Sequence, residues 1–223
     1  MKLSTPTSHS KTRPLVLAGG LAVVLAGLAT SVAAESLPMR WAPPSGMPPE
    51  PVAGSEAIIH KSAAGISAHV TSNGLTPGNA VTFWLVAVQN PDLCESNPCS
   101  PVEAMGEGMK MGTVAINGGG AVVGADGTIL ISSFMPTGSV KGNLFSTKLD
   151  KPETSEVHVV IHNHGPLIPG VEADMLGTYR GGCNDASIPP FYPPSAAMDG
   201  APGPNKCHTA QVALFLPTGK PTN

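Results

Sequence analysis

Three histidines, His158, His162 and His164, are separated by even numbers of residues and lie in a run rich in β-branched residues. Because side chains alternate along a β-strand, these three rings share one face while Val159 and Ile161 point to the other. At about 3.3 Å per residue, His162 and His164 are roughly 6.6 Å apart at Cα, so both rings can reach one ion. His158 is roughly 13 Å from His162, at the limit of reach. Imidazole nitrogens suit zinc or copper, so the pattern predicts a transition-metal site.

Such a site needs a further ligand from another strand, and the remaining histidines of the folded part are the candidates. The full candidate set is His162, His164, His158, His208, His60 and His69. An open coordination position on the ion would activate water, which would make the protein a metal-assisted enzyme. The alternative is that these histidines bind no metal. Histidines are common on the polar face of a half-exposed strand, and a histidine beside a Gly-Pro turn often forms hydrogen bonds only with the backbone of the turn.

Other chemical motifs give little. The sequence contains no G-x-S-x-G, no H-E-x-x-H and no glycine-rich loop that opens a helix, so no catalytic residue is assigned. Met105, Met109 and Met111 offer thioethers that suit Cu⁺, but methionine also fills gaps in irregular loops, and the second interpretation is favoured here.

Four cysteines follow the N-terminal segment, and an even number in an exported chain indicates disulfides. Three pairings are possible, and proximity in the sequence favours Cys94–Cys99 and Cys183–Cys207. Closing loops of about 6 and 25 residues would stabilise the fold by roughly 2 and 3.5 kcal/mol. The spacings C-x4-C and C-x23-C do not match the usual zinc pairs, which argues against a cysteine metal site.

The first 34 residues have the pattern of a signal peptide. The basic residues at the start are Lys2, Lys11 and Arg13. An apolar run over 15–29 follows, and Val32, Ala33 and Ala34 then supply small side chains for cleavage after Ala34. The run is also roughly long enough to be an uncleaved anchor. Cleavage would make the protein periplasmic or secreted, with no membrane span left.

The segment 35–54 contains six prolines and predicts a linker or a strap across the domain surface, because proline cannot donate to a β-ladder. The domain itself is expected over 55–223. Its apolar residues occur in short runs separated by turn signals, and 80–89 is apolar on both faces, as in a central strand covered on both sides. The predicted strands are 57–60, 66–71, 80–89, 112–116, 121–123, 128–134, 156–162 and 210–216, with a turn at 118–120.

About eight evenly spaced strands predict an all-β fold, either an antiparallel β-sandwich or a Greek-key barrel, in one domain. The chain carries a formal charge of −3. Three of its 12 basic residues and none of its 15 acidic ones precede Glu35, so the mature chain would carry −6. This acidic balance argues against a nucleic-acid partner.

Three segments together resemble a family of exported bacterial β-sandwich proteins of unassigned function. They are Gly-Leu-Thr-Pro-Gly-Asn-Ala-Val-Thr-Phe-Trp at 74–84, Asn-Pro at 90–91 with Cys94 and Cys99, and the segment 156–166 from Glu-Val-His to His-Gly-Pro. The resemblance spans most of 60–185 and implies a common domain without a known activity. A weaker likeness is to the chordin-type domain, a secreted β-rich module whose strands carry His-x-His. His162-Asn163-His164 followed by Gly181-Gly182-Cys183 also resembles copper-zinc superoxide dismutase, but its other ligand segments are not recognisable.

These observations predict a structural or interaction module with an unidentified protein or polymer partner. The Cys94–Cys99 loop and the proline-rich segment 184–206 would be its contact surfaces. The alternatives are a copper- or zinc-binding protein that uses the His-x-His strand and, third, a metal-assisted enzyme.

Overall fold

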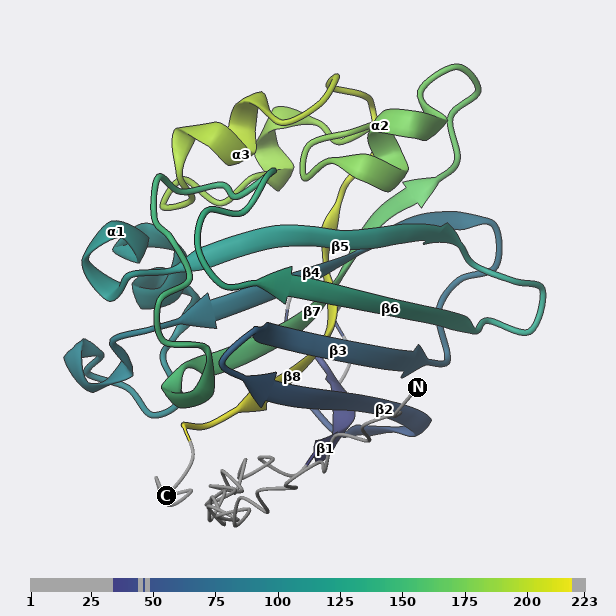
Figure 1. Cartoon of the computed structure of the whole chain (residues 1–223). Helices are drawn as coiled ribbons and strands as arrows, with labels where there is room; N and C mark the ends of the chain where they lie inside the picture. Colours follow the sequence, from purple (N-terminus) through teal and green to yellow (C-terminus); the bar gives the residue numbers. More distant parts are fainter. Residues whose placement is uncertain (1–33, 44–45, 47–48, 218–223) are drawn as a thin grey trace, which may run out of the picture. The chain divides into compact units, whose positions relative to one another are not determined.

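A computed structural model describes residues 34–43, 46 and 49–217, so the predicted signal peptide 1–34 lies outside the described residues except for Ala34. Eight antiparallel strands form one sheet in the order β5-β4-β7-β8-β1-β2-β3-β6 (Figure 1). The strands are β1 (Glu35–Trp41), β2 (Pro51–Ser62), β3 (Gly65–Ser72), β4 (Asn79–Val88), β5 (Val114–Val122), β6 (Ile129–Pro136), β7 (Glu156–Pro166) and β8 (His208–Phe215). The all-β prediction is confirmed.

The strand order is that of a Greek-key barrel. After β3 the chain crosses to the other end of the sheet, where it forms β4 and β5. The next strand, β6, returns to pair with β3, and β7 then pairs with β4. The two end strands of the sheet, β5 and β6, lie side by side in Figure 1, so the barrel is nearly closed.

Short helical segments occupy the connections between strands. The α-helices are α1 (Gly108–Met111), α2 (Glu172–Gly177) and α3 (Pro194–Met198). The other turns of helix are η2 (Pro91–Leu93), η3 (Val102–Gly106), η4 (Pro152–Thr154) and η5 (Asp185–Ser187). Most of them belong to the two long connections 89–113 and 167–207, which carry the candidate site.

All ten residues of β4 are buried, as its sequence predicts. Its inward side chains, Phe83 and Leu85 among them, join those of the other strands in an aliphatic barrel core. Its outward side chains, including Trp84 and Val86, belong to a second apolar cluster that lies outside the barrel. The barrel therefore has an apolar interior, and the outer face of β4 is buried as well, beneath the second cluster.

The segment predicted to be a linker, 35–54, is largely part of the barrel. Residues 35–41 form β1 between β2 and β8, and β2 already begins at Pro51. The prolines are accommodated where a strand is irregular: the β1–β2 register shifts between Pro38 and Arg40, and Pro51 is the first residue of β2. The sheet therefore includes residues outside the predicted domain bounds 55–223.

The predicted turn at 118–120 is also wrong, because these glycines lie inside β5. A Cβ atom at Gly120 would lie 2.2 Å from the carbonyl oxygen of Leu176 in α2, and one at Gly118 would lie 2.9 Å from the Cβ of Ser133 in β6. The glycines thus permit α2 to pack on one side of β5 and β6 to approach on the other.

Candidate functional site

Both predicted disulfides are present, and each one holds a connection that covers the outer face of β4 and β7. Cys94–Cys99 closes a short loop within the connection 89–113, and Cys183–Cys207 closes the last part of the connection 167–207. The described residues contain no free cysteine. In the first connection, Met105 and Met111 are buried in the outer cluster, as the packing interpretation predicts, whereas Met109 is 61% exposed and fills no gap.

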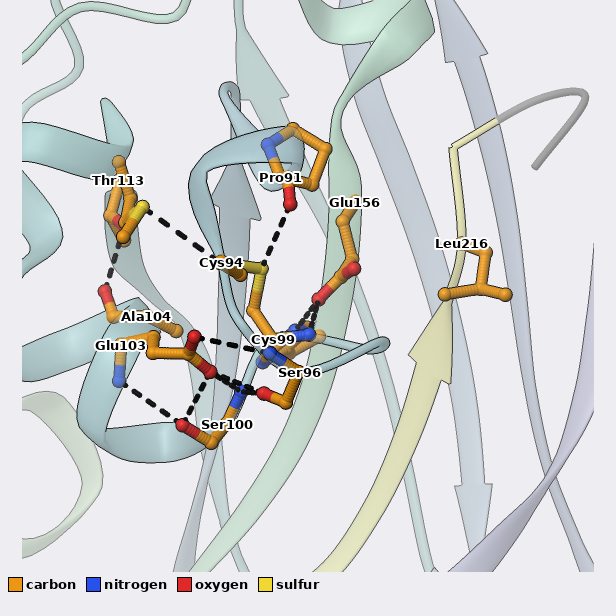
Figure 2. A network of polar contacts seen from close by, with 12 residues as sticks. Pro91, Cys94, Ser96, Cys99, Ser100, Glu103, Ala104, Thr113, Glu156 and Leu216 are labelled. Atoms are coloured by element: carbon orange, nitrogen blue, oxygen red, sulfur yellow. Dashed lines mark hydrogen bonds and ion pairs between the residues drawn. A yellow bond between two sulfur atoms is a disulfide. The ribbon is translucent and has the colours of Figure 1, made fainter. Parts of the chain in front are cut away.

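The first connection is organised around one carboxylate (Figure 2). Glu103 accepts hydrogen bonds from the hydroxyl groups of Ser96 and Ser100 and from the backbone N–H of Glu95 and Ser100. The Ser100 hydroxyl contributes most to holding the pKa of Glu103 at about 2, well below its usual 4.5. At neutral pH this carboxylate is charged and fixes the disulfide loop.

A second carboxylate joins this loop to the barrel. Oε1 of the buried Glu156 accepts a hydrogen bond of 2.8 Å from the backbone N–H of Cys99, as Figure 2 shows, and lies 2.6 Å from Nε2 of His158. This hydrogen bond occupies Nε2 of His158, so Nδ1 is the ring nitrogen left for another partner. His158 is therefore placed by Glu156 and lies apart from the other two histidines of the strand.

A cavity of about 530 Å³ lies between the outer face of β4, β7 and β8 and the two connections. Its wall is almost entirely apolar, with Trp84, Val160 and Val212 from the strands and Phe191 and Tyr192 from the second connection. Val212, Phe191 and Tyr192 are each only partly buried, so the rim of the cavity reaches the surface. Its polar groups include His158, Thr209 and Tyr179. Volume and lining match those of sites for small organic ligands.

His162 and His164 do share the outer face of β7, as predicted, but they are not half-exposed. The exposed fraction is 1% for His162 and 0% for His164, because the second connection covers both rings. The structural alternative, histidines on a solvated strand face, is thus contradicted for these two residues.

His164 has a complete set of hydrogen bonds. Its Nδ1 donates to the carbonyl oxygen of Gly181 at 2.8 Å, so the Nε2 of the neutral ring accepts from the Thr82 hydroxyl at 2.8 Å. The Thr82 oxygen in turn accepts from the indole N–H of Trp84 at 3.0 Å. Burial lowers the pKa of His164 from 6.5 to about 4, although the Gly181 carbonyl acts in the opposite direction.

His162, in contrast, has no hydrogen bond on either ring nitrogen, although both nitrogens are buried. Its ring stacks on Tyr179 with centroids 4.5 Å apart and meets His164 edge-on at 4.8 Å. Burial, with smaller effects of the charges on His164 and His208, lowers the pKa of His162 well below 6.5. A buried polar group without a partner costs about 1–3 kcal/mol, so such a group calls for an explanation.

The two histidines lie next to the second disulfide. One ligand atom each from His162, His164, Cys183 and Cys207 lies within 4.8 Å of all the others, and all four residues are buried. Nδ1 of His164 is 3.4 Å from Sγ of Cys183. Both sulfur atoms are joined in the disulfide, so neither is a thiolate in this state.

The other histidine candidates are not brought into this cluster. His60 and His69 lie on β2 and β3, which β8 and β1 separate from β7, and His69 bonds the hydroxyl of Ser132 at 2.7 Å. His208 pairs in register with Asn163 and influences His162 only through its charge. In the structure, the residues that join His162 and His164 in the cluster are thus cysteines, although the cysteine spacings argued against a cysteine metal site. The segment Gly181-Gly182-Cys183 was the one feature of the sequence that linked a cysteine to the two histidines.

Among residues 34–217, as far as they are described, no helix is long and apolar enough to cross a membrane. Comparisons of the chain with protein-family models, with curated proteins and with solved structures find no match. The resemblances noted from the sequence therefore remain expectations.

Proposed function

We propose that this chain is an exported, disulfide-stabilised binding module whose outer pocket holds a small, largely apolar ligand. The observation that carries the proposal is the cavity of about 530 Å³ against β4, β7 and β8. Isolated apolar side chains on a surface need no explanation, but a concave apolar site with a few polar groups is the usual form of a ligand site.

The construction of the pocket supports binding. Its floor consists of strands that are rigid because the barrel core packs behind them, and its cover consists of two connections that are each closed by a disulfide. A site that is formed before the ligand arrives loses little conformational entropy on binding. His158, fixed by Glu156, offers Nδ1 as a hydrogen-bonding partner for one polar group of an otherwise apolar molecule.

The proposal favours binding over catalysis. The His-Cys cluster is fully buried, whereas a metal that activates water needs an open position that a substrate can reach. The charged loop around Glu103 and the rim residues Phe191 and Tyr192 form the surface that a protein or polymer partner would contact when it delivers or receives the ligand.

Filling the pocket should abolish binding. N-phenyl-1-naphthylamine, an apolar dye that fluoresces in apolar surroundings, is expected to bind the wild type saturably at one site. Val212→Trp places an indole inside the cavity from the half-buried face of β8 and should raise the Kd of the dye at least tenfold, about 1.4 kcal/mol. Leu130→Trp on β6, where the side chain is 67% exposed, is the matched control and should bind like wild type. Equal binding by both variants would reject the pocket.

Export is the second part of the proposal. Two disulfides are typical of an oxidising compartment, and β1 begins at Glu35, directly after the predicted cleavage position. Expression of the whole chain in a Gram-negative bacterium should give a periplasmic or secreted protein whose intact mass corresponds to residues 35–223 with four oxidised cysteines. Recovery from the cytosol with residues 1–34 retained and free thiols would contradict export.

A further inference from the structure

We propose that reduction of the Cys183–Cys207 disulfide converts the buried cluster into a four-ligand metal site with His162 and His164, suited to zinc. The cluster joins two parts of the chain: β7 supplies both histidines, and the second connection supplies Cys183 and, at its last residue, Cys207. Two thiolates and two imidazoles are one of the usual ligand sets of tetrahedral Zn²⁺.

The geometry of the oxidised protein already brings these donors together. All four ligand atoms lie within 4.8 Å of one another, and Nδ1 of His164 is 3.4 Å from the Cys183 sulfur. The two sulfur atoms are bonded to each other in the disulfide, so neither is available as a thiolate ligand. Breaking this bond is the only covalent change that the site requires.

His162 provides an independent indication of a ligand. Both of its ring nitrogens are buried and have no hydrogen-bond partner, although its ring is held in place by Tyr179 and His164. Histidines of structural importance usually satisfy at least one nitrogen, as His164 does with Gly181 and Thr82. A ring that is fixed by stacking and whose nitrogens are free is prepared for a ligand that arrives later.

Residues around the cluster can orient the ligands. Thr82 contacts Nε2 of His164, so when Nδ1 is deprotonated and faces the metal, Nε2–H can donate to the Thr82 oxygen. A metal-bound histidine usually donates its second N–H in this way. Loss of the Thr82 hydroxyl in Thr82→Val is expected to weaken metal binding roughly 10- to 100-fold.

Reduction of the disulfide needs an external reductant such as a dithiol. A dithiol reductant gives up two electrons and two protons as its own disulfide forms, the Cys183–Cys207 bond breaks, and each cysteine sulfur takes one proton. Zn²⁺ then displaces both thiol protons into the solvent as it binds the two thiolates. In the oxidised protein only the two imidazoles remain, so the site is expected to bind metal weakly or not at all.

The test uses Co²⁺ as a spectroscopic substitute for Zn²⁺ on the full exported chain, purified without a His tag. Anaerobic protein reduced with a phosphine should bind one Co²⁺ with a thiolate-to-cobalt charge-transfer band, and Zn²⁺ should displace it. Oxidised protein should show no such band. His162→Ala should lose the band, whereas His158→Ala, on the same face of the strand but outside the cluster, should keep it.

A second measurement identifies the sulfur ligands. With Zn²⁺ present, Cys183 and Cys207 of the reduced protein should resist alkylation, while Cys94 and Cys99 should react, as mass spectrometry of peptides would show. A Cys94→Ser/Cys99→Ser variant should still bind one Co²⁺. Co²⁺ binding that survives His162→Ala, or a reduced chain that loses its strand signal in circular dichroism and binds no Co²⁺, would overturn the proposal. Binding of the apolar dye to the oxidised protein is independent of either result.

Discussion

Replacement of Cys183 and Cys207 together by serine is expected to lower the free energy of unfolding by about 3.5 kcal/mol. The disulfide joins residues 24 apart in sequence, and the loop it closes restricts the unfolded chain more than the folded one. Urea denaturation of the double variant, followed by circular dichroism, measures the loss. The same variant should bind the apolar dye more weakly, because the connection that the disulfide closes carries Phe191 and Tyr192.

The other disulfide supplies the control for this experiment. Cys94 and Cys99 close a loop of about 6 residues, so their replacement by serine should cost only roughly 2 kcal/mol on the same entropic argument. If the two double variants lose equal stability, loop closure is not the cause of the stabilisation, and strain or packing around the sulfur atoms would have to account for it.

Acidification is expected to destabilise the oxidised, metal-free protein strongly between pH 6.5 and pH 4. His164 has a pKa of about 4 in the folded chain and an ordinary value of 6.5 when it is unfolded. Because the folded pKa is the lower one, the unfolded chain binds more protons in this window, so the stability is fully present above pH 6.5 and is lost as the pH falls towards 4. His164 alone should account for about 3 kcal/mol at pH 4, and the buried His162 acts in the same direction.

Substitution separates this effect from the titration of carboxylates. His164→Gln should show a shallower fall in the free energy of unfolding from pH 6.5 to pH 4.5 than the wild type, although its stability at pH 7 is lower. His69→Gln, which removes a histidine that bonds an exposed serine hydroxyl, should keep the wild-type slope. Parallel curves for wild type and His164→Gln would show that His164 is not neutral and buried as described.

The strands could be predicted wherever the apolar pattern is local. The segment 80–89 is apolar on both faces, with Thr82 and Gln89 as its polar residues, and β4 is buried on both faces in the structure. Proline and glycine misled the prediction because their usual roles were overridden by tertiary contacts. Pro38 lies at an irregular position of β1, and Gly120 is required because the backbone of Leu176 lies directly against β5. Neither contact can be read from neighbouring residues.

The candidate site was predictable only in part, for a similar reason. Alternation along a strand places His158, His162 and His164 on one face, and proximity pairs Cys183 with Cys207; both predictions are confirmed. Burial of the two histidines depends on the connection 167–207, which has no periodic pattern to reveal where it folds. The cavity is likewise formed from segments far apart in sequence, so the sequence gives no direct sign of it.

The pairing of β1 with β8 has a consequence for the order of events during biosynthesis. Arg40 of β1 pairs in register with Val212 of β8, and the buried amine of Lys61 contacts both the Glu35 carboxylate and the backbone oxygen of Leu216. The barrel therefore cannot be completed before the ribosome has made β8, and such long-range pairing is slow to form. A nascent chain that stays unfolded until β8 emerges would suit the proposed export, because a translocation channel admits an unfolded chain.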